Sequence, residues 1–333
     1  MSASRMVVVG LVSAVALGAV LAGYLVLRGD RCALADDGSS PCGVLLGVTS
    51  ERPDLGSLAE AERFAGRPYD LVYRFHGLDD TVPTDEERAL VDSGRALHLN
   101  IETRVGPSPT DHTWADVAAG LHDDRLRDQA RGIASLDAPV MVTYDHEMDL
   151  PKKQGRGTPQ DFVAAWRRVH GIFHEEGADN AVWVWVAAAL EDTLHHVGEF
   201  WPGNDVVDWV SWDAYTRSGC DPLEPSTTVG EAVDVFHDWL EVEGPRHGID
   251  PEKPLMVSEL GGILAEDAPM TRQQWYAQIP AMLRERPRIR ALGLWDYSGT
   301  CDFRYSNDPT MRDTLRGLAA SEVFARLPVD AAP

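Results

Sequence analysis

The chain has 333 residues, of which 53 are Asp or Glu and 30 are Lys or Arg, so its formal net charge is −23 at pH 7. Such an acidic chain argues strongly against nucleic acid or an anionic membrane surface as a partner, because both would be repelled. The length allows a large buried core and is normal for an α/β barrel.

The first segment, residues 1–27, is typical of a transmembrane signal anchor. Residues 6–27 contain no charge and, at about 1.5 Å per residue, can cross roughly 30 Å of hydrocarbon. A cleaved signal peptide usually has a shorter apolar core, but cleavage after residues 33–35 remains an alternative. We therefore expect the protein at the extracellular face of the plasma membrane, or secreted if cleaved, with membrane contact only through this segment.

A short polar linker, residues 28–42, follows and contains two of the four cysteines. No two cysteines form a Cys-x-x-Cys pair, so a structural zinc site is not expected. An even number of cysteines after an export signal fits disulfide bonds, although four cysteines allow three pairings. We predict the pairs Cys32–Cys42 and Cys220–Cys301; the alternative is that one or both pairs stay reduced.

The body of the chain, residues 43–328, alternates apolar runs with amphipathic stretches. Eight short, nearly continuous apolar runs are typical of strands buried on both faces: 44–50, 69–77, 96–103, 139–148, 180–188, 207–215, 254–262 and 289–297. Helical spacing occurs at 86–93, 114–136, 162–176, 230–242 and 272–285. This alternation predicts an α/β fold, a closed (β/α)8 TIM barrel. A doubly wound open sheet is the rival, but no glycine-rich phosphate loop follows the first run.

Two glutamates stand where the fourth and seventh predicted strands end. The fourth predicted strand ends in residues 144–149, which include His146-Glu147, and the seventh ends in residues 258–262, which include Glu259. Active sites of such barrels lie at the carboxyl ends of the strands, and these two strands face each other across the opening. In a retaining glycosidase one carboxyl group protonates the leaving oxygen and another, about 5–5.5 Å away, attacks the sugar. We therefore predict Glu147 and Glu259 as the catalytic pair.

The sequence around both glutamates resembles glycoside hydrolase family 26, the β-mannanase family. Residues 146–149 are similar to the family's His-Glu-Met-Asn signature, residues 253–261 to its nucleophile strand with a Ser-Glu-Phe-Gly core, and residues 207–215 to its sixth strand, which ends in Asp-Gly-Tyr. The resemblance covers most of the body, from about residue 47 to 297. It implies Glu147 as the general acid/base and Glu259 as the nucleophile. His146 would line the sugar site, and Tyr215 would hydrogen-bond the nucleophile.

The chain departs from the family pattern beside the predicted acid/base. Asp149 replaces the usual Asn, and Thr143-Tyr144 stands where the family often has Arg-Pro. Extra negative charge near Glu147 would favour its protonated form. Because the Arg of the family's Arg-Pro pair is missing, the resemblance does not define the sugar contacts or the substrate. The chain therefore fits a divergent branch of the family.

Further residues near the predicted mouth are candidates for sugar contacts. We expect Asp149, Trp212 and Trp295 to bind substrate, the two tryptophans as platforms for sugar rings, with core packing as the alternative for both. His146 and Tyr215 could likewise be buried, hydrogen-bonded core residues. The alternative for Glu147 is a structural ion pair with an arginine such as Arg74.

These features predict a retaining glycoside hydrolase that acts on a β-linked polysaccharide, with mannan or mixed-linkage glucan as the class that the resemblance implies. The alternatives are a catalytically inactive barrel that binds cell-envelope glycan and a tethered transglycosylase. We expect a monomeric barrel without a cofactor. We also expect no metal site, because the strand-end aspartates 145, 213 and 296 show no ligand pattern. Lys152, Lys153 and Arg156 put positive charge near Glu147, which suits an acidic or substituted polysaccharide.

Overall fold

The computed structural model describes residues 32–103 and 112–330. The predicted signal anchor, residues 1–27, lies outside these residues. In the part of the chain that is described, no helix has the length and apolar character needed to span a bilayer.

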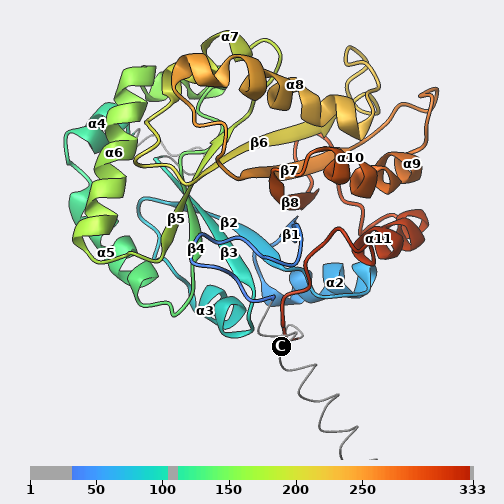
Figure 1. Ribbon diagram of the computed structural model, residues 1–333, viewed down its shortest axis with the longest axis horizontal. Coiled ribbons are helices and arrows are strands. Elements are labelled where there is room, and N and C mark those ends of the chain that lie inside the picture. The colour runs from blue at the N-terminus through green and yellow to red at the C-terminus, as the bar shows by residue number, and fades with distance from the viewer. Residues whose placement is uncertain (1–31, 104–111, 331–333) are drawn as a thin grey trace, which may run out of the picture.

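Eight parallel strands close into a barrel in chain order, and helices surround it (Figure 1). The strands are β1 (Leu45–Ser50), β2 (Leu71–Gly77), β3 (Ala96–Glu102), β4 (Val140–Tyr144), β5 (Ala181–Ala187), β6 (Trp209–Thr216), β7 (Leu255–Gly262) and β8 (Ile289–Asp296). Because β1 pairs with both β2 and β8, the sheet has no open edge. The predicted barrel is confirmed, and each apolar run contains one strand.

The helices between the strands follow the predicted pattern with two subdivisions. They are α2 (Leu55–Ala65), α3 (Asp85–Asp92), α4 (Trp114–Ala118), α5 (Asp123–Ala134), α6 (Pro159–Glu175), α7 (Leu194–Val197), α8 (Val229–Val242), α9 (Arg272–Ala277), α10 (Ile279–Glu285) and α11 (Arg312–Ala319). The stretch 114–136 forms two helices because Gly120, with a φ of 85°, ends the first. The stretch 272–285 divides at Gln278, shortly before Pro280. The sequence analysis did not predict α2, α7 and α11.

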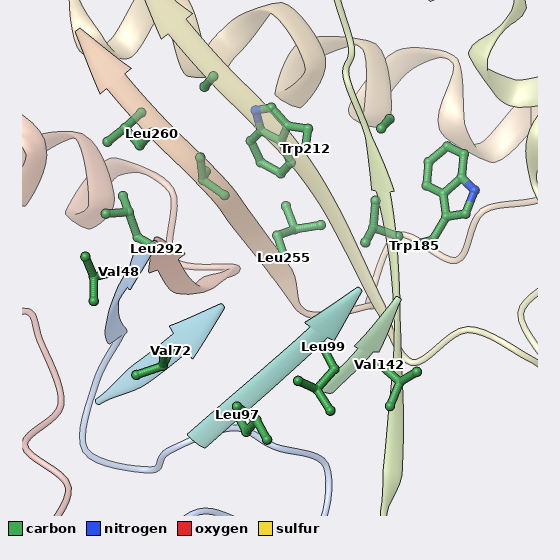
Figure 2. Close-up of a cluster of buried hydrophobic side chains, with 14 of the residues drawn as sticks. Val48, Val72, Leu97, Leu99, Val142, Trp185, Trp212, Leu255, Leu260 and Leu292 are labelled. Carbon is green, nitrogen blue, oxygen red and sulfur yellow. The ribbon is translucent and has the colours of Figure 1, made fainter. Parts of the chain in front are cut away.

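The hydrophobic core has an outer and an inner layer. The outer layer lies between strands and helices and contains Val48, Val72, Leu99, Trp185 and Leu292 among others (Figure 2). The inner layer fills the amino end of the barrel with residues from the starts of the strands, all 2% exposed or less: Leu45, Leu71, Met141, Val184, Trp209 and Met256. This apolar plug closes the barrel at the end opposite the predicted site.

Further along the same strands the interior becomes polar. The Tyr73 ring stacks on the His98 ring with centroids 4.0 Å apart, and His98 Nε2 lies 2.8 Å from Thr143 Oγ1. On the other side of the barrel, the hydroxyls of Ser211 and Ser258 lie 2.5 Å apart. These contacts form a hydrogen-bonded layer between the apolar plug and the mouth.

The segment that follows α11 returns to the start of the barrel. Phe324 forms a parallel bridge with Val44, immediately before β1. The Asp70 carboxylate accepts hydrogen bonds from the backbone N–H groups of Leu46 (3.1 Å) and Leu327 (3.1 Å). This C-terminal segment is therefore fastened to the first two strands, as its position beside β1 and α2 in Figure 1 shows.

Both predicted disulfide bonds are present. Cys32–Cys42 closes a short loop beside the amino end of the body, with Cα atoms 5.3 Å apart. Cys220–Cys301 joins the loop after β6 to the segment after β8, with Cα atoms 6.0 Å apart. The second bond links two loops at the carboxyl end of the barrel.

Candidate active site

Glu259 faces the barrel interior because a β-bulge interrupts β7. The register between β6 and β7 shifts after Val257, and Asp213 then pairs with Glu259, so Ser258 is an extra residue. Ser258 already points inward, where its hydroxyl contacts Ser211. Strict alternation would turn Glu259 toward the helices; the bulge turns it back into the barrel.

The neighbouring strand makes room for this bulge with a glycine. A Cβ atom on Gly293 of β8 would lie 2.2 Å from the carbonyl oxygen of Ser258. That is far inside van der Waals contact, so any side chain at this position would displace the bulge. Gly293 thus helps to set the direction of Glu259.

Tyr215 of β6 donates a short hydrogen bond to Glu259 Oε2, as the family resemblance implied. Glu259 is 4% exposed, and its Oε1 has no hydrogen-bond partner among the described residues. Burial and the nearby charge of Glu147 raise the pKa of Glu259 to about 8, although Tyr215 opposes this shift. Burial and the Glu259 charge also raise the pKa of Tyr215, which keeps its hydroxyl protonated as a donor.

Glu147 is held by an unusual backbone turn after β4. Asp145 and Glu147 both have a φ of 52°, the left-handed region that non-glycine residues rarely adopt. Such a residue costs about 1–3 kcal/mol and persists only where the surroundings hold it. Here the Glu147 N–H donates to the Val186 carbonyl (2.9 Å), and the Asp145 N–H donates to Ile101 (2.9 Å). The turn therefore ties Glu147 to strands on both sides of β4.

The buried carboxylate of Asp145 anchors the loop that covers this turn. Trp114 Nε1 donates to it at 2.5 Å, Lys153 Nζ at 3.1 Å, and Arg156 through a short bond. Lys153 also donates to the carbonyl of His146. These bonds hold the 3₁₀ helix η1 (Pro151–Arg156) against the strand end and fix the backbone on which Glu147 stands.

The Glu147 carboxylate contacts two basic side chains. Its Oε2 lies 2.8 Å from Lys152 Nζ and 3.7 Å from His146 Nε2. Burial alone would raise the pKa of Glu147, but the charges of His146, Lys152 and Lys153 outweigh burial and lower it. The alternative ion pair with Arg74 is not formed; Arg74 donates to the carbonyl of Tyr73 (3.1 Å).

His146 belongs to a polar cluster on the β3 side of the mouth. The ring atom Nδ1 of His146 lies 2.9 Å from Glu102 Oε1 and 2.8 Å from Asn100 Nδ2. The backbone N–H of His146 donates a hydrogen bond to Asn100 Oδ1. Burial would raise the pKa of Glu102, but His146, Lys153 and Arg156 hold it far below its usual range. Glu102 is thus a permanent carboxylate that orients the imidazole beside Glu147.

A cleft of about 400 Å³ opens beside these residues. Its lining includes His146, Glu102 and the rings of Phe75, Trp295 and Tyr297. The Phe75 and Tyr297 side chains are 36% and 37% exposed, and Trp295 contacts both rings edge-on or tilted. Exposed aromatic faces beside carboxylates suit a sugar chain, so Trp295 lies where a sugar platform was predicted.

Asp213 is a site residue that the sequence analysis considered only as a metal ligand and set aside. It is 6% exposed, and neither carboxylate oxygen has a hydrogen-bond partner among the described residues. Burial and the charges of Glu259 and Glu147 raise its pKa well above the usual range. Asp213 lies two residues after the inward-facing Ser211 on β6, so the alternation of that strand was the signal that could have placed it in the site.

Two predicted substrate contacts are wrong. Trp212 is 1% exposed and packs 5.6 Å from Phe236 of α8, because it points out of the barrel toward the helices (Figure 2). Asp149 is also 1% exposed, and its carboxylate accepts from the N–H groups of Ala188 and Ala189 and from Thr193 Oγ1. Asp149 therefore joins the β4 and β5 loops instead of meeting substrate.

One group of described residues has the spacing of metal ligands: Asp234, His237 and Asp238 on α8. Asp234 already forms an ion pair with Arg286 at 2.6 Å. The group lies on a helix outside the barrel and includes none of the residues at the mouth.

Comparison with solved structures places this barrel beside family 26 enzymes. A family 26 β-mannanase from Bacteroides ovatus matches with a TM-score of 0.59 and 16% identity, covering 85% of this chain and 90% of that one. The catalytic domain of a family 26 endo-β-1,4-mannanase from Bacillus sp. JAMB-750 matches with a TM-score of 0.60 and 14% identity, covering 86% and 88%. The chain therefore has the fold that the resemblance implied.

Sequence comparison gives shorter matches. A β-1,3-xylanase from Vibrio sp. is 33% identical over 107 residues, and one from Alcaligenes sp. is 30% identical over 107 residues. These matches cover 32% of this chain but only 23% and 22% of the two relatives, so the chain spans about a quarter of their length. No family model matches the chain.

Proposed function

We propose that this protein is a retaining glycoside hydrolase that cleaves a β-linked polysaccharide, with Glu147 as acid/base and Glu259 as nucleophile. The observation that carries the proposal is the convergence of both carboxyl groups at the mouth, by two separate backbone irregularities. A positive-φ turn presents Glu147, and a β-bulge presents Glu259. The two carboxyl groups are close enough for the charge of Glu147 to raise the pKa of Glu259. Backbone irregularities of this kind are typical of catalytic sites.

In the proposed reaction Glu147 gives its proton to the glycosidic oxygen while Glu259 attacks the anomeric carbon. The bond to the leaving sugar breaks, and a covalent glycosyl-enzyme forms. Glu147, now ionised, removes a proton from water, and the resulting hydroxide displaces Glu259 from the same carbon. The two inversions give net retention of configuration.

The free protein holds the right number of protons for this reaction. Because the pKa of Glu259 is raised to about 8 and that of Glu147 is lowered, the pair carries one proton at neutral pH. Catalysis needs this proton on Glu147, whereas the neighbouring Lys152 and His146 favour the ionised form of Glu147. Substrate binding must therefore weaken the contacts that keep Glu147 ionised, among which the ion pair with Lys152 is the shortest.

The substrate class follows from the relatives and from the cleft. The two similar structures described above are mannanases, and the two sequence relatives are β-1,3-xylanases. Both names describe β-linked polysaccharides, and the aromatic cleft suits such a chain. We propose mannan, mixed-linkage glucan and β-1,3-xylan as the polymers to test.

We also propose that the protein is a monomer and that it lies outside the cytoplasm. The two disulfide bonds support the location, because such bonds form and persist in oxidising compartments.

The test uses the full-length chain and its Glu147→Gln and Glu259→Gln variants on these polymers. We expect reducing ends from at least one polymer, and a loss of about 10²–10⁴-fold in each variant. NMR of the first-formed product should show the β anomer. The exposed Glu322, on the segment after α11, provides a control: Glu322→Gln should keep full activity.

Two outcomes would favour the alternatives. A parent protein that binds a polymer without cleaving it, with both variants binding equally, would indicate an inactive glycan-binding barrel. Products longer than the starting oligosaccharide would indicate a transglycosylase, because a sugar would then replace water as the acceptor.

A further inference from the structure

The three basic residues of η1 have different surroundings. Lys153 is 2% exposed and bonds Asp145 and the His146 carbonyl. Arg156 bonds the same Asp145 carboxylate and lies 3.5 Å from Glu102. The side chain of Lys152, in contrast, is 66% exposed. Lys153 and Arg156 thus hold the loop in place, while Lys152 faces the solvent side of the site.

Lys152 reaches the functional atom of Glu147. Its Nζ lies 2.8 Å from Glu147 Oε2, in an ion pair between an exposed ammonium and a mostly buried carboxylate. Burial would lower the pKa of Lys152, but Glu147, and then Glu102 and Glu259, raise it, so the ammonium stays charged. A permanent cation therefore stands beside the carboxyl group proposed to protonate the leaving oxygen.

This position conflicts with acid catalysis unless the substrate changes it. An ammonium in contact with Glu147 favours the carboxylate, but Glu147 must be protonated when the glycosidic bond breaks. A second anion near the leaving sugar would draw Lys152 away and return Glu147 to its protonated form. Since Glu147 contacts the glycosidic oxygen in the proposed reaction, Lys152 lies within reach of the sugar that departs.

We propose that Lys152 determines specificity by binding an anionic group, the carboxylate of a uronic acid, on the leaving-group side of the scissile bond. The inference rests on the proposed hydrolase function and names its substrate class. The net charge of −23 would repel a densely charged polymer. The substrate that fits both facts is a mostly neutral β-glycan with widely spaced uronic acid residues.

The experiment uses matched oligosaccharides that differ only on the leaving sugar. One carries a neutral hydroxymethyl group on C5, the second a carboxylate in its place, and the third a sulfate ester of that hydroxymethyl group. The full-length protein is compared with Lys152→Gln, and with Lys152→Arg as the variant that keeps the charge. The readout is the ratio of kcat/KM for each anionic substrate to that for the neutral one.

We expect the parent protein to prefer the carboxylate substrate by about tenfold, the size of a charge-assisted hydrogen bond. Lys152→Gln should abolish this preference, and Lys152→Arg should keep most of it. A larger preference for the sulfate ester would keep the anion site but overturn the uronic acid assignment. A parent ratio of one, or an unchanged ratio in Lys152→Gln, would overturn the inference.

A binding arm separates this inference from the proposed function. Calorimetry with the Glu259→Gln variant, which leaves the Lys152–Glu147 pair intact, measures affinity for the same three oligosaccharides. Tighter binding of the carboxylate substrate, lost in Glu259→Gln/Lys152→Gln, supports the anion site even if no substrate is cleaved. Equal affinities overturn it, whereas an absence of cleavage by the parent overturns the hydrolase.

Discussion

The two ends of the barrel interior are built from the same eight strands but have opposite character. At the amino end, Leu71, Met141 and Trp209 form an apolar plug in which every side chain is buried against another. At the carboxyl end, Asp213 and Glu259 are also buried, yet both carboxylate oxygens of Asp213 and the Oε1 atom of Glu259 have no hydrogen-bond partner within the described residues. Burial stabilises the fold at the first end and raises carboxyl pKa values at the second, so stability and chemistry are separated along the barrel axis.

Removing a carboxylate from the polar end gives the largest expected effect. Glu259→Gln should lower kcat/KM by about 10²–10⁴-fold, because no nucleophile remains for the anomeric carbon. The same change should raise the midpoint of thermal unfolding at pH 8, since a buried ionised group is replaced by a neutral one. Assay and calorimetry on one sample measure both. If Glu259→Gln loses stability together with activity, the polar end also stabilises the fold, and the separation between the two ends is wrong.

The pH dependence of stability should isolate the same residue. The folded pKa of Glu259 is raised to about 8, whereas an unfolded glutamate titrates near 4.5. The folded state therefore binds the extra proton between these values, and the stability from this group is complete below about pH 4.5 and lost as the pH rises through about 8. Chemical denaturation should show a fall of a few kcal/mol across this range, which is smaller in Glu259→Gln. Parallel curves for the two proteins would contradict the shift.

At the apolar end, Leu71→Ala should lower stability and leave activity nearly unchanged, the reverse of the effect expected for Glu259→Gln. The residue is 2% exposed inside the plug, so its loss should reduce the free energy of unfolding by about 2–5 kcal/mol. Activity per folded molecule should stay near that of the parent at low temperature. A large change in kcat with little change in stability would show that the two ends are coupled.

The glycine beneath the β7 bulge tests how Glu259 is aimed. Gly293→Ala would place a Cβ atom 2.2 Å from the Ser258 carbonyl oxygen and so displace the bulge. We expect about a tenfold or greater loss in kcat and a loss of roughly 1–3 kcal/mol in stability. Gly317→Ala, on α11 with open space around its Cβ position, is the matched control: it should leave kcat unchanged and should not lower stability, because alanine is favoured over glycine inside a helix. Full activity of Gly293→Ala would show that the bulge does not set the direction of Glu259.

The smallest expected effect concerns the tryptophan that was wrongly predicted to meet sugar. Trp212→Phe should cost about 1–2 kcal/mol in stability by leaving a space beside Phe236, without changing KM. Trp295→Phe, inside the cleft, should raise KM with a smaller stability loss. Paired unfolding and kinetic measurements separate the two; a raised KM in Trp212→Phe would restore the original prediction.

The sequence predicted the strands because fully buried parallel strands are continuous apolar runs, and it predicted helices that begin with a capping residue such as Thr158. It placed Glu147 and Glu259 near the carboxyl ends of the fourth and seventh strands; Glu147 lies in the turn after β4, and Glu259 lies in the second half of β7. It did not predict to which side of the sheet each side chain points. On β7, the bulge at Ser258 interrupts the alternation that would give the direction of Glu259. On β6, Trp212 lies one residue away from the inward-facing positions, so its side chain points toward the helices. The ion pair between Lys152 and Glu147 depends on the fold of the intervening turn, which no local pattern encodes.

The pairing of β1 with β8 determines when the barrel can close during synthesis of the chain. β1 leaves the ribosome early, but its second pairing partner is β8, and the C-terminal segment that bonds to Val44 and Asp70 follows later still. Until then both edges of an unclosed sheet remain open to mispairing. The barrel is therefore finished only after translation of nearly the whole chain, and a nascent chain stopped before residue 289 would be a substrate for chaperones.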